Sequence, residues 1–520
     1  MNVIIFLTDQ ERSTQHFPEG WEASLPGLTQ LKKHGLDFTN NFTNSCMCSP
    51  ARSTFMTGQF PAQHNVKSTL EASMPEDEYP DQIVLSTGFA NVATVMSEAG
   101  YNVVYKGKWH CSKPDNDPDG NWTQKDLEDY GFSRWNPKDA GADQSLEEGG
   151  GPGKDKTSPY QDYENDARFM YDDEGETKEG VLAYINYLKS DEAKEDGKPF
   201  CLVISLVNPH DVLFLGNETF KKAEYGVKWT QGSIELPDTY EEDDLSTKPT
   251  VQKRFLNMGM GLGVLKPDRK KIDYVNFYGN LIKSSDAYLK EVLDALGEDL
   301  LNETLIIRTS DHGEMGLAHG GMRQKNFNFY EEAIRVPLIY SNPRLFPDPQ
   351  TSDDLVSHVD FLPTLASLVG VAQEEEWKGC DYSQLITNPE EKFEGQSDII
   401  FTYDDWQSGQ SSGPYPGQPS KINGNTVAPN HIVAIREKRF KLAEYYDDGN
   451  FTSGDDRVAS EYEMYDLKND PNEIYNLTNQ SDLEALTNNN EKQMAAYQKE
   501  FDHLKSKLEV VKEKLGITNN

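Results

Sequence analysis

Cysteine is scarce in this chain, which has five cysteines among 520 residues. Cys46 and Cys48 are two positions apart, which is too close for an easy bridge, and no C-x-x-C pair occurs. Thiols this few and this scattered exclude a disulfide framework, and they offer no cysteine pair with the usual spacing of a metal site.

Positive charge is also in short supply. The 50 basic side chains stand against 87 acidic ones, which gives a formal net charge of -37. A field of this sign argues against nucleic acid and anionic membranes as partners. It also disfavours large polyanionic substrates, unless a local basic pocket overrides it.

Long apolar runs are missing. No stretch reaches the ~18 apolar residues that a membrane span needs. The first ten residues, MNVIIFLTDQ, contain five consecutive apolar residues and no basic segment before them, unlike a signal peptide. We therefore expect a cytoplasmic protein, or a periplasmic or secreted one if a leader has been removed.

Short apolar runs alternate with helical patterns along most of the chain. Runs at 3–7, 101–106, 200–207 and 305–309 are typical of buried strands, and helical stretches separate them. This alternation predicts an α/β fold, with a large mixed, mostly parallel sheet and helices on both faces.

We expect a catalytic domain over 1–390, with insertions at about 113–175 and 212–268, and a smaller C-terminal α+β subdomain over 391–520. The short runs near its start, without long helices between them, indicate a short antiparallel sheet. Its last helix has an a/d-type seam: Met494, Tyr497, Phe501, Leu504, Leu508, Val511 and Leu515. The seam either packs against its own domain or forms a subunit contact, so a homo-oligomer remains open.

Polar side chains gather where the predicted strands end. Ligands bind at the carboxyl ends of strands in open α/β sheets, so we expect these side chains to converge. The groups are Asp9 and Gln10, Lys108 and His110, Asn208 and His210, and Asp311 and His312. Asp9, Gln10, Asp311 and His312 suit calcium, magnesium or manganese better than zinc.

Cationic side chains accompany these candidate ligands. Lys108, Lys325 and Arg52, clustered around a divalent ion, would bind a tetrahedral anion. His210 is then the natural general acid for a leaving oxygen.

Cys48 lies just before a predicted helix at 53–57, and Pro50 suits the first turn of that helix. Partial positive charge at a helix start lowers the pKa of a thiol. A thiolate is nevertheless a poor ligand for a hard cation, so chemistry alone leaves the role of Cys48 open.

The segment Cys48-Ser49-Pro50-Ala51-Arg52, followed by Thr57-Gly58, resembles the signature of type I sulfatases, within the alkaline phosphatase superfamily. The resemblance extends over nearly the whole chain. It is carried further by the segments VIIFLTDQ, Gly107-Lys108-Trp109-His110, Ser310-Asp311-His312-Gly313-Glu314, Lys325 before Tyr330-Glu331-Glu332, and Tyr465 to Pro471. Asp9-Gln10, where many members have two aspartates, resembles the choline sulfatase and phosphonate monoester hydrolase branches.

The resemblance implies an alkaline phosphatase-like fold and a sulfate monoester as substrate. It implies that a generating enzyme oxidises Cys48 to formylglycine (3-oxoalanine), whose hydrated form attacks sulfur. It implies one divalent metal, calcium by default with manganese or magnesium as alternatives, on Asp9, Gln10, Cys48, Asp311 and His312. Its catalytic set would be Cys48, Arg52, Lys108, His110, His210 and Lys325.

Two other functions compete with hydrolysis of a small or oligomeric sulfate ester. The same site could cleave phosphonate monoesters or phosphate diesters. The chain could also be a non-catalytic anion-binding relative whose thiol is never converted.

Overall fold

The structure is a computed structural model. It describes residues 1–13, 17–71, 82–116, 120–141, 166–172, 179–215, 227–257, 264–265, 269–388, 393, 395–405, 421–422, 426–429, 431–447 and 458–517. Among the helices in these ranges, none combines the length and the apolar character needed to cross a membrane.

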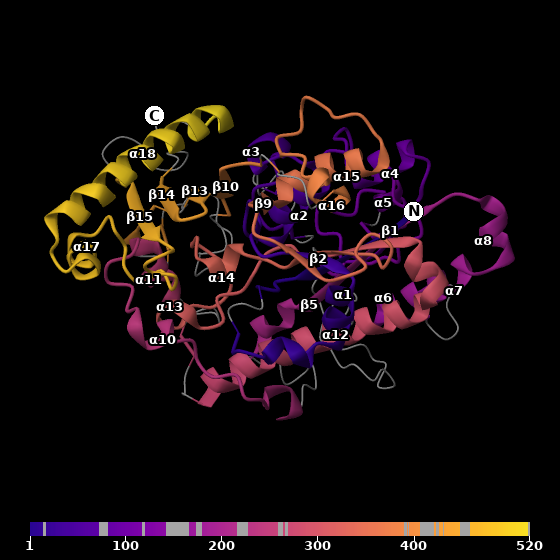
Figure 1. Cartoon of the computed structure of the whole chain (residues 1–520), viewed down its shortest axis with the longest axis horizontal. Coiled ribbons are helices and arrows are strands. Elements are labelled where there is room, and N and C mark those ends of the chain that lie inside the picture. The colour runs from indigo at the N-terminus through magenta and orange to yellow at the C-terminus, as the bar shows by residue number, and fades with distance from the viewer. Residues whose placement is uncertain are drawn as a thin grey trace.

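A seven-stranded mixed sheet forms the centre of the larger part of the chain (Figure 1). In spatial order its strands are β4 (Asn102–Gly107), β5 (Phe200–Pro209), β1 (Asn2–Asp9), β6 (Thr304–Ser310), β7 (Leu338–Ser341), β2 (Gly35–Phe38) and β8 (Gln350–Ser352). The first four strands run parallel, β7 is antiparallel to both of its neighbours, and β2 and β8 are parallel. The predicted mostly parallel sheet is confirmed, although the sequence analysis missed the edge strand β8.

Helices cover both faces of this sheet, which explains why its central strands appear in the sequence as continuous apolar runs. Alternate residues of β1 point to opposite faces: Val3 and Ile5 join one core cluster, and Ile4 and Phe6 join the other. The first cluster packs against α2 (Cys48–Thr57), α4 (Val92–Glu98) and α15 (Phe361–Val369). The second packs against α1 (Pro26–Lys33), α7 (Val181–Leu188) and α12 (Arg269–Asn302).

The C-terminal part contains the predicted antiparallel sheet. Its strands, in spatial order, are β10 (Asp398–Tyr403), β13 (His431–Glu437), β14 (Phe440–Tyr446) and β15 (Glu461–Asp466). The first three are predicted by the sequence runs at 399–403, 431–436 and 440–446, and β15 is not predicted. The domain limits at 390 and 391 fall on residues outside the described ranges, so that division stays a prediction.

Short elements connect these two parts or extend them. They are β3 (Asn41–Phe42), α3 (Pro61–His64), α5 (Lys125–Glu128), α6 (Ala167–Met170), α8 (Asp191–Asp196), α10 (Thr239–Glu242), α11 (Thr250–Leu256), α13 (Ala318–Gly321), α14 (Glu331–Ile334), β9 (Val356–Ser357), α16 (Ser383–Thr387), β11 (Lys421–Ile422), β12 (Thr426–Val427) and α17 (Gln480–Thr487). Several of them lie within the predicted insertions, much of which is outside the described ranges.

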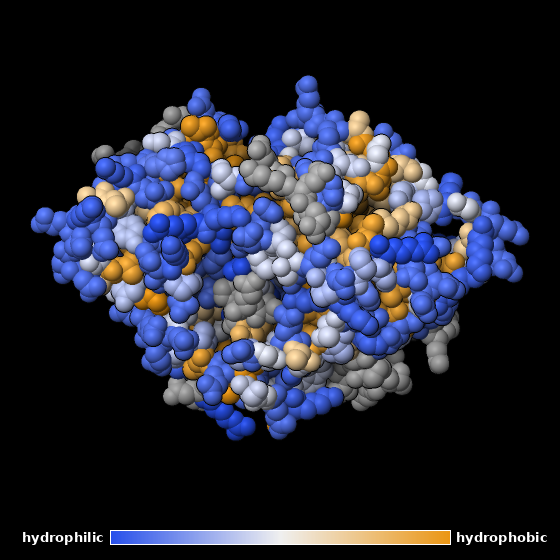
Figure 2. Space-filling model, in the orientation of Figure 1, coloured by the Kyte–Doolittle hydropathy of each residue, from blue (hydrophilic) through white to orange (hydrophobic). Residues whose placement is uncertain are grey.

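The long C-terminal helix α18 (Glu491–Leu515) packs against its own domain. Leu504, Leu508 and Val511 are buried in one cluster with side chains of β13 and β14. The a/d seam found in the sequence therefore packs within the chain from Tyr497 to Leu515, and Met494 is not part of that cluster. The face of the molecule drawn in Figure 2 is mostly hydrophilic, with smaller hydrophobic patches, as the charge excess predicts.

We expect Leu508→Ala to lower the free energy of unfolding by about 2–5 kcal/mol, because it opens a cavity between α18 and the sheet. The matched control is Val510→Ala two positions away, where the side chain is 50% exposed and the expected change is below about 0.5 kcal/mol. Urea unfolding followed by circular dichroism measures both. Equal effects of the two substitutions would contradict this packing.

Candidate active site

The carboxyl ends of four adjacent parallel strands meet at one edge of the sheet. Asp9 ends β1, Lys108 follows β4, His210 follows β5, and Asp311 follows β6. The order β4–β5–β1–β6 makes these strands direct neighbours, so their polar ends converge as the sequence predicted.

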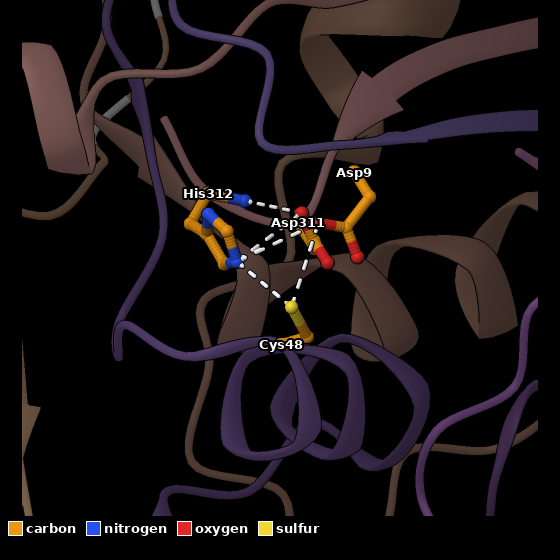
Figure 3. A group of neighbouring side chains, drawn as sticks. All are labelled: Asp9, Cys48, Asp311 and His312. Atoms are coloured by element: carbon orange, nitrogen blue, oxygen red, sulfur yellow. Dashed lines mark hydrogen bonds and ion pairs between the residues drawn. The ribbon is translucent and has the colours of Figure 1, made fainter. Parts of the chain in front are cut away.

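Helix α2 points its first turn at this edge. It begins at Cys48 itself, earlier than the predicted start at Ser53, and Gly58 ends it in the left-handed conformation at φ 65°. Met47 precedes the helix with φ 72° and caps it without a side-chain hydrogen bond. This geometry places the thiol of Cys48 toward the strand ends (Figure 3). Arg52 lies one turn further along the same helix.

Four potential metal ligands lie together above α2. One donor atom from each of Asp9, Cys48, Asp311 and His312 falls within 4.8 Å of the others, and all four residues are buried (Figure 3). The thiol of Cys48 is 3.4 Å from Asp9 Oδ1 and 3.2 Å from His312 Nε2. His312 Nδ1 lies 3.1 Å from the carbonyl of Gly313, so it carries the proton and leaves the Nε2 lone pair facing the group. Two carboxylates and a correctly turned imidazole fit a divalent cation.

The Arg52 guanidinium joins the two carboxylates. Its Nη2 lies 3.1 Å from Asp9 Oδ2, and its Nε lies 2.8 Å from Asp311 Oδ2. Its Nη1 donates to the Lys108 carbonyl at 2.9 Å and to Ser205 Oγ at 2.8 Å. One side chain therefore links α2 to the ends of β1, β4 and β6 and to the middle of β5.

Two lysines complete the cationic side of the site. Lys108 Nζ is 2.7 Å from Asp9 Oδ2. Lys325 Nζ donates to Gln10 Oε1 at 2.5 Å, which brings the Gln10 amide to the same cluster. The backbone N–H of Gln10 also donates to Asp311 Oδ1 at 3.0 Å.

The pKa values of the two buried carboxyl groups, Asp9 and Asp311, are shifted in opposite directions. Burial alone would raise the pKa of Asp9, but Lys108 and Arg52 hold it well below its usual value. Burial and the charge of Asp9 raise the pKa of Asp311 to about 7. Without a bound cation, Asp311 is therefore the carboxyl that takes up a proton.

The expectation that a helix start lowers the thiol pKa of Cys48 is wrong. Burial and the neighbouring Asp9 carboxylate raise that pKa to about 12. Desolvation and like charge outweigh the helix dipole, whose effect is at most about 2 kcal/mol. Cys48 is a neutral thiol in this site, and Cys46 is a buried thiol whose pKa is also raised by burial.

The two other candidate histidines are buried and neutral. Burial, together with Lys108, lowers the pKa of both His110 and His210. The N–H at His110 Nε2 donates a hydrogen bond to the carbonyl of Leu70 at 2.8 Å, which leaves Nδ1 as the basic nitrogen.

Sequence reasoning missed three side chains that hold the site together. Asp139 accepts the backbone N–H groups of Trp109 at 2.9 Å and His110 at 2.8 Å, and so holds His110 at φ 57°. Ser205 binds Arg52, and Glu314 binds Gln10. Of the three, Glu314 alone belongs to a motif that carries the family resemblance, and the resemblance implies no role for it.

The fold is that of the sulfatases, within the alkaline phosphatase superfamily. The sulfatase family profile matches residues 1–371, and a profile for the C-terminal region of N-sulphoglucosamine sulphohydrolase matches residues 319–500. The chain belongs to the sulfatase family and is a sulfuric ester hydrolase.

Relatives of this chain differ in the esters they are named for. A choline-sulfatase of Rhizobium meliloti is 26% identical over 74% of this chain and 70% of its own length. The structure of a 2-O GAG sulfatase matches 99% of this chain and 92% of its own with a TM-score of 0.68 at 19% identity. A phosphonate monoester hydrolase from Silicibacter pomeroyi matches 96% of this chain and 95% of its own with a TM-score of 0.63 at 17% identity. At such identities these structures establish the fold, and the substrate of this chain has to be inferred separately.

We expect divalent cations to raise the thermal unfolding midpoint more at pH 8 than at pH 6. The raised pKa of Asp311 means that its ionisation destabilises the folded, metal-free protein as the pH rises from about 3.8 through about 7. A cation that binds the carboxylate offsets this loss and displaces the proton. Differential scanning fluorimetry of chelator-treated protein, with and without added CaCl₂ or MnCl₂, measures the shift.

Asp311→Asn is the control for that measurement, because the amide cannot titrate. It should lower the cation-dependent shift and remove its dependence on pH. An unchanged pH dependence in this variant would assign the effect to another group.

Proposed function

We propose that this chain hydrolyses a sulfate monoester with a nucleophile made from Cys48. The observation that carries the proposal is the position of Cys48. It begins α2 with its thiol directed at the two carboxylates and His312, while Arg52 from the same helix joins the carboxylates. A thiol with a raised pKa is a weak nucleophile and a poor partner for a hard cation. Conversion to formylglycine would replace it with oxygen donors that suit both roles.

A divalent cation fits the donor set, and we assign it to Asp9, Gln10, Asp311, His312 and the converted Cys48, with calcium as the expected ion. When bound, it would polarise the ester oxygens and stabilise developing negative charge. Lys108 and Arg52 keep Asp9 ionised, and Arg52 holds both carboxylates in place by its contacts with Asp9 and Asp311. Without these two cations, the ionised pair would carry the full desolvation cost of two buried charges.

Lys108 and Lys325 are proposed to hold the sulfate group. Both ammonium groups lie next to candidate ligands, Lys108 beside Asp9 and Lys325 beside Gln10. An anion bound between them would lie within reach of the nucleophile, and the ammonium charges would neutralise its oxygens. This local cluster supplies the positive potential that the net charge of -37 does not.

The two buried histidines are proposed to move protons. His210 would protonate the leaving oxygen. Burial and Lys108 lower its pKa in the free site, and the charge of a bound sulfate ester would oppose that effect and favour its protonated form. His110, whose Nδ1 is its basic nitrogen, would accept a proton from the nucleophile's hydroxyl after attack.

The substrate is proposed to be a sulfate ester with little negative charge of its own. The acidic surface favours a small or short oligomeric sulfate ester over a large sulfated polysaccharide. A cationic ester such as choline sulfate would suit that field, and the choline-sulfatase relative is compatible with it.

Peptide mass spectrometry over residues 44–58, joined to an activity screen, tests the proposal. The protein should be produced together with a formylglycine-generating enzyme. Cys48 should lose its sulfur and gain an aldehyde oxygen, and the converted protein should hydrolyse aryl sulfates faster than aryl phosphonates. Faster phosphonate cleavage would favour a phosphonate monoester hydrolase, and an intact Cys48 would favour the non-catalytic alternative. Cys48→Ala is the control for contaminating activity.

We expect the loss of activity in His210→Ala to depend strongly on the leaving group of the ester. A general acid contributes about 10²–10⁴-fold when the leaving oxygen needs a proton. The variant should therefore lose about that factor on an alkyl sulfate and about tenfold or less on a nitrophenyl sulfate. Steady-state kcat on the two esters measures the difference, and equal losses on both would remove His210 from the proton-donor role.

A further inference from the structure

Gln10 occupies a fixed backbone position beside the candidate metal site. It has φ 70°, in the left-handed region, at the end of β1. Its N–H donates to Asp311 Oδ1 at 3.0 Å, and its carbonyl accepts from Tyr278 Oη at 2.6 Å. These contacts fix the backbone from which the Gln10 side chain extends.

The partners of that amide decide which way it faces. Its Nε2 donates to Glu314 Oε2 and, at 3.2 Å, to Gln324 Oε1. Its Oε1 accepts from Lys325 Nζ at 2.5 Å. A carboxylate only accepts hydrogen bonds and an ammonium group only donates them, so the flipped amide would lose both charged partners. The carbonyl oxygen has a second lone pair available to a cation.

Glu314 is itself held firmly. It is fully buried, and its Oε1 accepts from Tyr274 Oη at 2.7 Å, from the N–H of Gln324 at 2.9 Å and from the N–H of Gly316 at 3.2 Å. These three donors hold the carboxylate against Gln10, and Glu314 is not part of the ligand group of Asp9, Cys48, Asp311 and His312. Glu314 thus acts on the site through Gln10.

We infer that Glu314 is a positioning residue that turns the Gln10 amide so that its carbonyl oxygen faces the cation. The same contact explains why glutamine stands at position 10. An aspartate there would place another carboxylate against Glu314 and beside Asp9 and Asp311, and like charges in a buried site repel strongly. This inference rests on the metal site of the proposed function.

A double-mutant cycle on cation affinity tests the inference without using activity. The full-length chain, with the state of Cys48 verified by mass and kept equal in all variants, is treated with chelator. It is then titrated with CaCl₂ and MnCl₂ by isothermal titration calorimetry. Glu314→Gln alone should weaken binding by about 10–100-fold, because the amide of Gln10 loses its fixed orientation.

The sign of the effect should reverse when position 10 carries aspartate. In Gln10→Asp, the further change Glu314→Gln should strengthen binding, because the amide introduced at position 314 can donate to the new carboxylate while repulsion is removed. A loss of the same size in both backgrounds, or no loss in either, would overturn the inference while leaving the metal site intact. If the wild-type chain bound neither cation, the proposed metal site and this inference would both fail.

Two further variants separate positioning from general damage to the fold. Glu463→Gln is the matched control, because Glu463 is also buried and accepts from Tyr445 Oη at 2.7 Å, but it lies in the C-terminal sheet. It should bind cations like the wild type. Tyr274→Phe removes one donor to Glu314 and should weaken binding by about 2–10-fold even if Glu314→Gln does not fold. Wild-type affinity in Tyr274→Phe would count against the inference.

Discussion

The ion pairs of Arg52 with Asp9 and Asp311 are the contact on which the rest of the site depends. Both carboxylates are fully buried, and an isolated buried charge is costly enough that a carboxyl group normally takes up a proton instead. The guanidinium is planar and permanently charged, so it can meet two carboxylates from different strands at once. Its further contact with Ser205 extends the same constraint to β5.

A sheet with helices on both faces makes this arrangement possible. The two core clusters hold β1 from either side, so the ends of β4, β5, β1 and β6 form a rigid edge. Polar groups placed on such an edge keep their positions even though several of them repel one another. The opposite pKa shifts of Asp9 and Asp311 are the result. Asp9 lies closer to Lys108 and stays charged, and its charge raises the pKa of Asp311.

Features that depend on local pattern could be predicted from the sequence, and features that depend on distant partners could not. The apolar runs identified the central strands, and the polar residues after them located Asp9, Lys108 and Asp311. Strand β15 was missed because charged residues make up half of its sequence, EYEMYD, and leave no continuous apolar run. The start of α2 was misplaced because Met47 caps it without a side-chain hydrogen bond. The thiol pKa of Cys48 and the role of Glu314 were out of reach, because each depends on a residue that meets it only in the folded chain.

The burial of Cys48 has a consequence for the order of events during synthesis. Only 2% of this residue is exposed, and His312, 264 positions further along the chain, lies against its sulfur. An enzyme that oxidises this thiol has to contact it directly, and a side chain this deeply buried in the folded chain cannot be contacted. That access is lost once β6 pairs with β1 and encloses the cysteine. Modification of Cys48 would therefore have to take place on the nascent or still unfolded chain, in competition with folding.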